Sequence, residues 1–320
     1  MDEQIAALPS QFSWQPSFEG GAPQGSPRHF IVCGMGGSHL GAILLRRHDP
    51  ELPLRVHSDY GLPAWRYGGR IILSSHSGNT EEVLDTAQKA SDAGLDCVAI
   101  TTGGALADLA RARNIPLILL PTNEVEPRMA VGHSMLAIAY AMQNTSLLGA
   151  VAAIGSVLAP QELRAHGEEL ATSLNGRIPL IYSSEQNRGI ANFWKVAFNE
   201  TTKIPAFRYP VPEFCHNELS GFDAVLSTHG LSSPLAAVFL MDTADHPRTQ
   251  LRMKIAAEML EDKGMSVSSI ELPGVSALHT ALSGVVIGVW TAYTLAHQYG
   301  VEDAQTPLIA AFKERMSHYV

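Results

Sequence analysis

The chain has 320 residues, of which 46% are hydrophobic and 17% are charged, and these values are typical of a globular protein with a large core. This length is sufficient for two α/β halves. The formal net charge of −9, from 22 basic and 31 acidic residues, argues against a general nucleic-acid-binding protein, whose affinity depends on basic patches. A small anionic ligand remains compatible with it, because the local field of a pocket can oppose the global charge.

The sequence also bears on the compartment of the protein. The N-terminus, Met1-Asp-Glu-Gln4, lacks the basic flank and apolar segment of a signal peptide, and no uninterrupted apolar run reaches about 18 residues. We therefore expect a cytoplasmic protein with no membrane partner. The cysteines Cys33, Cys97 and Cys215 are scattered, and the first two lie in strand-like runs, which favours free buried thiols over disulfides.

Strand and helix patterns alternate in the first half of the chain. Residues 1–27 are rich in proline and are expected to form an N-terminal arm with a short helix at best. Strand-like runs cover residues 29–33, 53–57, 70–75, 96–101 and 116–120. Helical patterns cover residues 38–48, 80–93, 104–113 and 129–147. Strands separated by helices of about 10–15 residues predict a doubly wound parallel sheet over residues 28–150.

The pattern then repeats over residues 151–320. A helical connector is expected over residues 151–175. Strands are predicted at 178–183, 223–227, 235–241 and 265–271, and helices near 185–200, 247–263 and 275–299. A last helix is predicted to begin at Thr306-Pro307, a threonine N-cap followed by proline at the first helical position. The element order therefore predicts two similar α/β domains.

Two loops rich in glycine and hydroxyl groups carry most of the functional signal. Gly34-Met-Gly-Gly-Ser38 and Ser75-His-Ser-Gly-Asn-Thr80 each follow a strand-like run and precede a helical pattern. Small residues let the backbone approach a ligand, and the N–H groups and dipole of a helix N-terminus favour an anion. The hydroxyl groups of Ser38, Ser75, Ser77 and Thr80 add four possible donors. This combination predicts a phosphate site for a sugar phosphate.

Nucleotide binding is the first alternative. Gly34-Met-Gly36 matches the start of G-x-G-x-x-G, with Asp59 in place to bind a ribose, but His39 stands where the third glycine belongs. A dinucleotide site has no use for a second hydroxyl-rich loop two strands later, and neither loop has the Gly-Lys-Ser/Thr of a P-loop. Tight turns with serine caps and no ligand are the structural alternative.

The two loops resemble those of the sugar isomerase (SIS) domain, a flavodoxin-like fold that binds phosphosugars. Gly36-Gly37-Ser38 followed by Ser75-x-Ser-Gly-x-Thr80 carries this resemblance. Further matches are Glu126-Pro-Arg128, Trp194-Lys-Val-Ala-Phe-Asn-Glu200, Cys215-His-Asn-Glu218 and Lys313. Together they resemble the bifunctional phosphoglucose/phosphomannose isomerase family from about residue 30 onward. The resemblance implies two tandem SIS domains, each a doubly wound parallel sheet flanked by helices.

The resemblance also implies a reaction, the interconversion of glucose 6-phosphate and mannose 6-phosphate with fructose 6-phosphate. Such an isomerisation needs a base, a group that opens the sugar ring and a cation near the negative oxygen. Glu200 corresponds to the base that moves a proton through a cis-enediolate, and Arg128 to the cation. His216 corresponds to a ring-opening residue contributed by the neighbouring subunit of a homodimer.

The remaining matched residues lie near the end of the chain. Thr306 and Lys313 are seven residues apart and share one helical face. The resemblance implies that Lys313 assists ring opening and that Thr306 admits the C2 epimer. Without the resemblance, the residues alone favour a surface carboxylate at a helix end for Glu200, a solvated loop residue for His216 and a solvated lysine for Lys313. Arg128 fits a surface arginine as well as a cation at the site.

Metals, cofactors and other functions complete the expectations. The 13 histidines include no H-x-H, no H-E-x-x-H and no close cluster with cysteine, so neither a metal nor a cofactor is expected. His39 and His76 depart from the familiar form of the motifs, which puts substrate preference in question. An isomerase of a pentulose or amino-sugar phosphate is one alternative. A phosphosugar-sensing regulator is another, but residues 1–27 are too short for the helix-turn-helix domain that such proteins usually carry.

Overall fold

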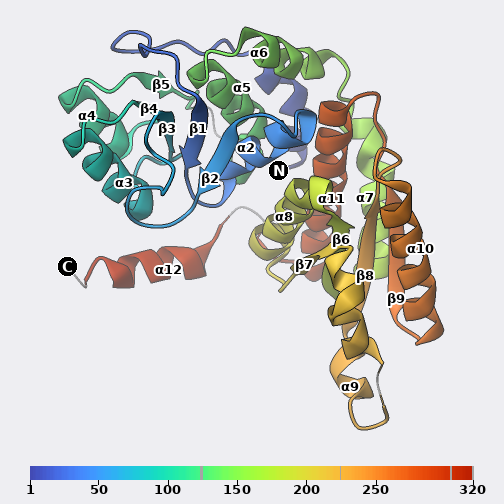
Figure 1. Cartoon of the computed structure of the whole chain (residues 1–320). Coiled ribbons are helices and arrows are strands. Elements are labelled where there is room, and N and C mark those ends of the chain that lie inside the picture. Colours follow the sequence, from blue (N-terminus) through green and yellow to red (C-terminus); the bar gives the residue numbers. More distant parts are fainter. Residues whose placement is uncertain (123–124, 224, 303–304, 319–320) are drawn as a thin grey trace. The chain divides into compact units, whose positions relative to one another are not determined.

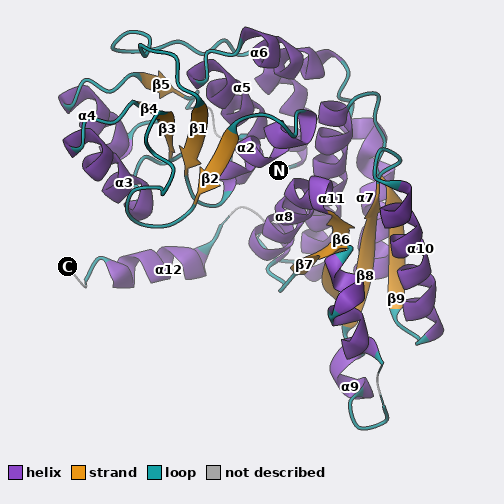
Figure 2. Cartoon of the chain, viewed as in Figure 1, coloured by secondary structure: helices purple, strands orange, loops and turns teal. Residues whose placement is uncertain are grey.

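The computed structural model describes residues 1–122, 125–223, 225–302 and 305–318, and the chain divides into two compact units (Figure 1). The N-terminal unit comprises Glu3–Gln161 and Pro273–Ser283, and the C-terminal unit comprises Met1–Asp2, Glu162–Leu272 and Gly284–Val320. Each unit contains a parallel sheet with helices on both faces (Figure 2). The predicted fold class is confirmed, while the domain boundaries at 27/28 and 150/151 stay a prediction.

The sheet of the N-terminal unit has the order β2-β1-β3-β4-β5, and all its strands are parallel. This is the strand order of the flavodoxin-like fold. Its strands are β1 (His29–Cys33), β2 (Leu54–His57), β3 (Gly69–Ser74), β4 (Cys97–Thr101) and β5 (Leu117–Leu119). All five strands predicted in this half of the chain are confirmed.

Helices cover both faces of this sheet. They are α2 (Gly37–His48), α3 (Glu81–Asp92), α4 (Gly104–Ala112) and α5 (Val131–Ala141), and α6 (Thr145–Ala152) packs on α5. Ile71 and Leu73 of β3 pack with Val83 of α3 and Leu106 of α4 in one apolar cluster. Ile72, which lies between them and points to the opposite face, is also fully buried. Burial on both faces explains the continuous apolar run in this strand.

The helix predicted over residues 129–147 is wrong, because the segment is broken. A short 3-10 turn, Pro127–Met129, precedes α5, and α5 and α6 are separate helices. Gln143 between them adopts a left-handed backbone with φ of 55°, and the side chain of Asn144 then accepts a hydrogen bond from Leu147 N at 3.0 Å. An N-cap of this kind starts a new helix.

The segment that follows Asp2 packs into the N-terminal unit. It contains helix α1 (Asp2–Ala6) from Glu3 onward and the 3-10 helix η1 (Leu8–Ser13). The buried amide of Gln11 donates to Met129 O at 2.9 Å and accepts from Gly132 N at 2.9 Å. Gln11 thereby satisfies backbone groups at the N-terminus of α5, which would otherwise be buried without partners.

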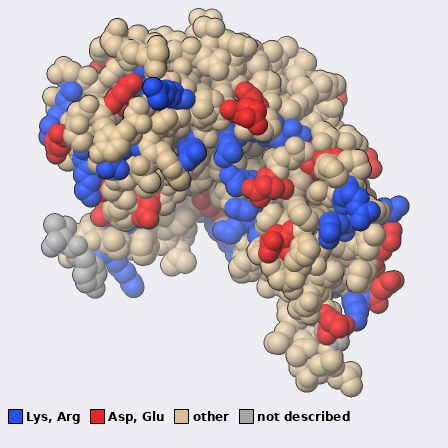
Figure 3. Space-filling model, in the orientation of Figure 1, with Lys and Arg blue, Asp and Glu red and all other residues tan. Residues whose placement is uncertain are grey.

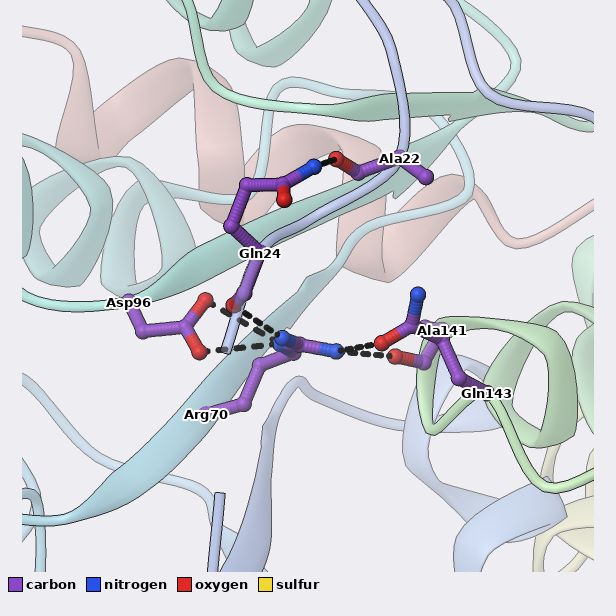
Figure 4. A network of polar contacts seen from close by, with 6 residues as sticks. All are labelled: Ala22, Gln24, Arg70, Asp96, Ala141 and Gln143. Atoms are coloured by element: carbon purple, nitrogen blue, oxygen red, sulfur yellow. Dashed lines mark hydrogen bonds and ion pairs between the residues drawn. The ribbon is translucent and has the colours of Figure 1, made fainter. Parts of the chain in front are cut away.

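A buried arginine ties several segments of the N-terminal unit together (Figure 4). Arg70, near the start of β3, is fully buried. Its Nε donates to both carboxylate oxygens of Asp96 at 3.0 Å. Its Nη1 donates to Ala141 O at 3.2 Å and Gln143 Oε1 at 3.0 Å, and its Nη2 donates to Gln24 O at 2.8 Å. One guanidinium thus joins the N-terminal segment, the sheet and the end of α5.

The sheet of the C-terminal unit has the order β7-β6-β8-β9 and is also parallel. Its strands are β6 (Ile178–Ser184), β7 (Phe207–Val211), β8 (Leu235–Met241) and β9 (Ser266–Glu271). Its helices are α7 (Arg164–Leu174), α8 (Arg188–Ala197), α9 (His229–Ser232), α10 (Pro247–Asp262) and α12 (Pro307–Met316), together with most of α11 (Ala277–Tyr299). This order matches β2-β1-β3-β4 of the first sheet, so the two units repeat one topology.

The strand predicted at residues 223–227 is wrong. The described residues of that range form no strand, and Ala224 lies outside the described residues. The strand beside β6 is β7, which contains Pro210 and pairs only with β6. Proline removes a backbone donor and is tolerated in an edge strand. The sequence pattern did not predict β7 because proline argues against a strand, and a strand with proline is tolerated here because it lies at the edge of its sheet.

Helix α11 is long and apolar enough to cross a membrane, but 83% of its most apolar window is buried inside the protein. In the C-terminal unit it packs against Trp194, whose Nε1 donates to Gly284 O at 2.7 Å. A methyl group at Gly288 would lie 2.4 Å from the Trp194 ring. Such burial and close packing are those of a core helix.

Charged side chains are interspersed on the surface. On the face shown in Figure 3, Lys and Arg (blue) alternate with Asp and Glu (red) over both units. Several form exposed pairs, among them Arg113 with Asp92 at 3.0 Å. Exposed pairs of this kind stabilise a fold by about 1 kcal/mol or less.

The cysteines are free in the structure. Cys33 and Cys97 are buried, as predicted, and burial raises the pKa of both thiols. Cys215 is partly exposed.

Candidate active site

The first glycine-rich loop connects β1 to α2. Gly36 is the N-cap of α2 and has φ of 51°, a backbone conformation that favours glycine. A methyl group at Gly37 would lie 2.9 Å from Pro127 O and 3.3 Å from the Cα atom of Arg128. Glycine at position 37 is therefore required by the close approach of the turn that carries Arg128.

The second loop lies beside the first because β1 and β3 are neighbouring parallel strands. Ser74 Oγ donates to Ser38 O at 2.9 Å, and His76 N donates to Ser38 Oγ at 3.1 Å. A methyl group at Gly78, which has φ of 70°, would lie 1.8 Å from Gly103 O. The loop is thus held between the first loop and the loop that follows β4.

The four candidate hydroxyl groups differ in their surroundings. Ser38 Oγ accepts from His76 N, and Ser77 Oγ accepts from Asn79 N at 3.3 Å, so each hydroxyl hydrogen is available to a ligand oxygen. Ser75 is buried, and its hydroxyl pairs with Thr80 Oγ1 at 2.8 Å. Ser38 and Ser77 are the better placed donors, and Ser75 orients Thr80.

Arg128 lies in the turn that contacts Gly37. The residue is 5% exposed, and its Nη1 lies 3.5 Å from Glu126 Oε2. Its position rules out the interpretation of a simple surface arginine. A guanidinium held next to the first loop adds positive charge where an anion would bind.

Three histidines surround the two loops. His39 lies on α2, His76 in the second loop and His133 in the first turn of α5. Burial lowers the pKa of all three. The pKa of His133 falls to about 4, and the neighbouring His76 contributes to this shift. The three side chains are therefore neutral at neutral pH.

This shift predicts acid sensitivity of the N-terminal unit. The pKa of His133 is about 4 when folded against 6.5 for the free side chain, so below pH 6.5 the unfolded chain binds a proton that the folded chain does not. Stability is retained above pH 6.5 and is lost as the pH falls. We expect the unfolding free energy of wild type, relative to that of His133→Gln, to fall by about 2 kcal/mol between pH 7.5 and 5. Urea titrations at both pH values measure this difference, and an unchanged difference contradicts the prediction.

Glu200 lies in a π-helical turn. Helix α8 continues into the turn Phe198–Thr202, which ends at Lys203 with φ of 61°. Glu200 is partly buried, and Asn199 Oδ1 accepts from Ala206 N at 3.1 Å. Turns of this type are frequent at functional sites.

Thr306 and Lys313 lie at the end of the C-terminal unit. Thr306 is the N-cap residue of α12, as predicted, although its side chain makes no capping hydrogen bond within the described part of the chain. Lys313 lies on the same helix, which has no buried residue among those described. Lys203 Nζ donates to the carbonyl oxygens of Glu200 and Gln305, so it links the Glu200 turn to the segment before Thr306.

His216 lies in a 3-10 turn that follows β7 and is exposed. Two residues later, Glu218 Oε1 accepts from the buried Tyr182 hydroxyl at 2.7 Å, and burial together with this carboxylate raises the pKa of Tyr182. Asn217 Nδ2 donates to Glu213 Oε1 at 2.8 Å. Asn217 and Glu218 therefore hold the loop that presents His216.

The candidate residues divide between the two units. The N-terminal unit brings together the two loops and Arg128, while the C-terminal unit carries Glu200, His216, Thr306 and Lys313. Sequence reasoning missed Lys203 and His133. The signal in the sequence that could have pointed to them was their closeness along the chain to predicted site residues, Lys203 to Glu200 and His133 to Arg128. Within the described ranges, no group of three or more His, Cys, Asp or Glu side chains is arranged to hold a metal ion.

The second sheet carries a different polar group at the equivalent edge. Asn187, fully buried after β6, donates through Nδ2 to Ser184 Oγ at 3.1 Å and to Asp242 Oδ2 at 2.9 Å. It also lies 3.4 Å from both oxygens of Asp245. These carboxylates follow β8, which corresponds to β3. We call Ser184, Asn187, Asp242 and Asp245 the buried polar cluster.

Comparison with known proteins gives the context of this site. Residues 164–316 match the family described as bacterial phospho-glucose isomerase C-terminal SIS domain. The bifunctional phosphoglucose/phosphomannose isomerase of Aquifex aeolicus is 28% identical over 97% of this chain and 96% of its own. The bifunctional phosphoglucose/phosphomannose isomerase of Pyrobaculum aerophilum is 31% identical over 91% of this chain and 87% of its own. A solved glucose-6-phosphate isomerase-like protein of Thermus thermophilus has a TM-score of 0.59 and 20% identity over 94% and 93% of the two chains.

The repeated flavodoxin-like topology, together with the match over residues 164–316, defines a protein built from two SIS domains. The chain belongs to the bifunctional phosphoglucose/phosphomannose isomerase family, because relatives of that name match it over nearly its full length.

Proposed function

We propose that this chain interconverts glucose 6-phosphate and mannose 6-phosphate with fructose 6-phosphate without a metal ion. The observation that carries the proposal is the joining of the two loops through Ser38, with Arg128 held beside them. Ser38, Ser77, Thr80 and the backbone N–H groups of Gly36 and Gly37 hold the phosphate ester, and Ser75 supports Thr80. Hydroxyl and amide donors at helix N-termini bind such an anion without a metal.

The chemical steps follow from the residues that remain. His216 and Lys313 open the sugar ring: the C1 hydroxyl gives up its proton as the bond between C1 and the ring oxygen breaks, and the ring oxygen takes up a proton. Glu200 then removes a proton from one carbon of the open sugar and returns it to the adjacent carbon, through a cis-enediolate. Arg128 stabilises the negative oxygen of that intermediate, since a fixed cation acts most strongly where charge develops.

A coupled assay tests this function. Fructose 6-phosphate formation is measured from glucose 6-phosphate and from mannose 6-phosphate, each with EDTA present, and turnover of both sugars is expected. A preparation of Glu200→Gln made in the same way controls for contaminating isomerases. Activity that EDTA abolishes contradicts the metal-free mechanism. Binding without turnover favours the phosphosugar-sensing alternative.

Thr306 is proposed to determine tolerance of the C2 epimer. Thr306→Ala removes a hydroxyl and a methyl group at the start of α12 while leaving Pro307 in place, so the helix can still begin there. We expect kcat/KM for mannose 6-phosphate to fall by about 10-fold relative to glucose 6-phosphate, the scale of one lost hydrogen bond to a substrate. An unchanged ratio of the two activities removes Thr306 from this role.

We further propose a cytoplasmic homodimer in which His216 serves the site of the partner. The support is the exposure of His216 and of three apolar side chains in the same connection between β7 and β8. These are Val225, Leu226 and Leu231. Co-expression of Glu200→Gln and His216→Ala chains tests this arrangement. A shared site restores about a quarter of wild-type activity, because half of the dimers are mixed and one of their two sites is intact. Sites within one chain restore none.

A further inference from the structure

Lys203 stands out among the residues around the candidate base. It closes the π turn, with its backbone N–H donating to Phe198 O, and has φ of 61°. A non-glycine residue with a left-handed backbone is uncommon and strained. Such strain persists where surrounding contacts hold the residue in place.

The contacts that hold Lys203 are made by its ammonium group. Lys203 Nζ donates to the carbonyl oxygens of both Glu200 and Gln305. The Glu200 carbonyl lies in the last turn of a helical segment, where carbonyl groups lack further helical donors and carry partial negative charge, so a cation is well suited to it. The ammonium group has three donors, and two of them connect segments that are far apart in the sequence.

These two segments carry the proposed functional residues of this part of the chain. Glu200 is the candidate base. Gln305 directly precedes Thr306, the N-cap of helix α12, and that helix bears Lys313. A single side chain therefore joins the turn of the candidate base to the start of the helix that carries the proposed ring-opening lysine.

We propose that Lys203 is a positioning residue, whose ammonium group holds the Glu200 turn against the segment that leads into Thr306. This inference rests on the proposed function. The ammonium group of Lys203 donates to backbone carbonyl groups of both segments, so the role proposed for it is to fix the place of the base. A base displaced by about 1 Å can cost about 10²-fold in rate, whereas binding of the phosphate depends on other residues.

The test separates positioning from binding. Lys203→Met keeps the length of the side chain and removes the ammonium group. We expect kcat to fall by about 10–100-fold for both sugars, while the dissociation constant of a hexitol 6-phosphate, which cannot isomerise, changes by less than about 3-fold. Lys203→Arg keeps a cation that can reach both carbonyl groups and is expected to restore most of the activity. Lys254→Met, at an exposed position on α10, is the matched control.

Two further measurements keep the inference falsifiable. Lys203→Gly removes the ammonium group and suits the left-handed backbone, so it replaces the Met variant if that variant folds poorly. Hydrogen exchange of the backbone from Gln305 to Lys313 is expected to rise in the Met and Gly variants and not in the control. Wild-type kcat in the Met variant, or no advantage of Arg over Met, overturns the inference. An inactive wild type contradicts the proposed function instead, and hydrogen exchange then still tests the link.

Discussion

Replacing Glu200 by glutamine is expected to lower kcat by about 10²–10⁴-fold, the usual contribution of a general base. Glutamine keeps the size and the hydrogen-bonding oxygen of the side chain but cannot accept the proton. The π turn Phe198–Thr202 is closed by a backbone hydrogen bond from Lys203 N–H to Phe198 O, which the substitution leaves in place, so the fold is expected to survive. The coupled assay with glucose 6-phosphate measures the loss.

Label exchange sharpens this experiment. Glucose 6-phosphate deuterated at C2 loses its label to water when a base removes that proton, and this loss is expected to vanish in Glu200→Gln. Glu258→Gln, at an exposed position on α10, is the matched control and is expected to retain full activity. Undiminished turnover or label loss in Glu200→Gln contradicts its assignment as the base.

Replacing Arg70 by leucine is expected to destabilise the N-terminal unit by about 3 kcal/mol. The loss is large because removing one member of a buried hydrogen-bond network leaves its partners buried without that hydrogen bond. The guanidinium is fully buried and makes hydrogen bonds to Asp96, Ala141, Gln143 and Gln24. Its removal leaves several of these groups without that partner. Urea unfolding followed by circular dichroism measures the change.

Arg113→Leu provides the comparison, because Arg113 pairs with Asp92 on the surface. A loss of less than about 1 kcal/mol is expected there. Arg70 lies near the start of β3, and the hydroxyl-rich loop follows the opposite end of that strand, so the folded fraction of Arg70→Leu is expected to keep its kcat. Equal stability losses in the two variants contradict the role assigned to Arg70.

The first sheet could be predicted from the sequence because its strands are buried on both faces. Ile71, Ile72 and Leu73 form a continuous apolar run for that reason. Strand β7 could not be predicted in the same way, since Pro210 interrupts it and only its edge position makes the proline tolerable. The break between α5 and α6 depends on the backbone of Gln143, which an apolar pattern does not encode.

The candidate site was predictable to a similar extent. The hydroxyl-rich loops have a local signature, because glycine and serine at a strand end serve the backbone directly. The burial of Arg128 against Gly37 depends on the packing of α2 beside the turn before α5, and no local pattern specifies it. The link from Lys203 to Gln305 joins residues about a hundred positions apart, which a single sequence does not reveal.

The buried polar cluster makes the edge of the second sheet unlike the edge that carries the hydroxyl-rich loops. Asp242 directly follows β8, whereas Ser75 directly follows β3, the corresponding strand of the first sheet. A carboxylate at that place repels a phosphate, while hydroxyl groups can donate to one. Asn187, which is hydrogen-bonded to Asp242, directly precedes the helix that runs into the Glu200 turn. The two copies of one topology therefore offer different chemistry at the same edge, an anion-binding surface in one and a fixed helix start in the other.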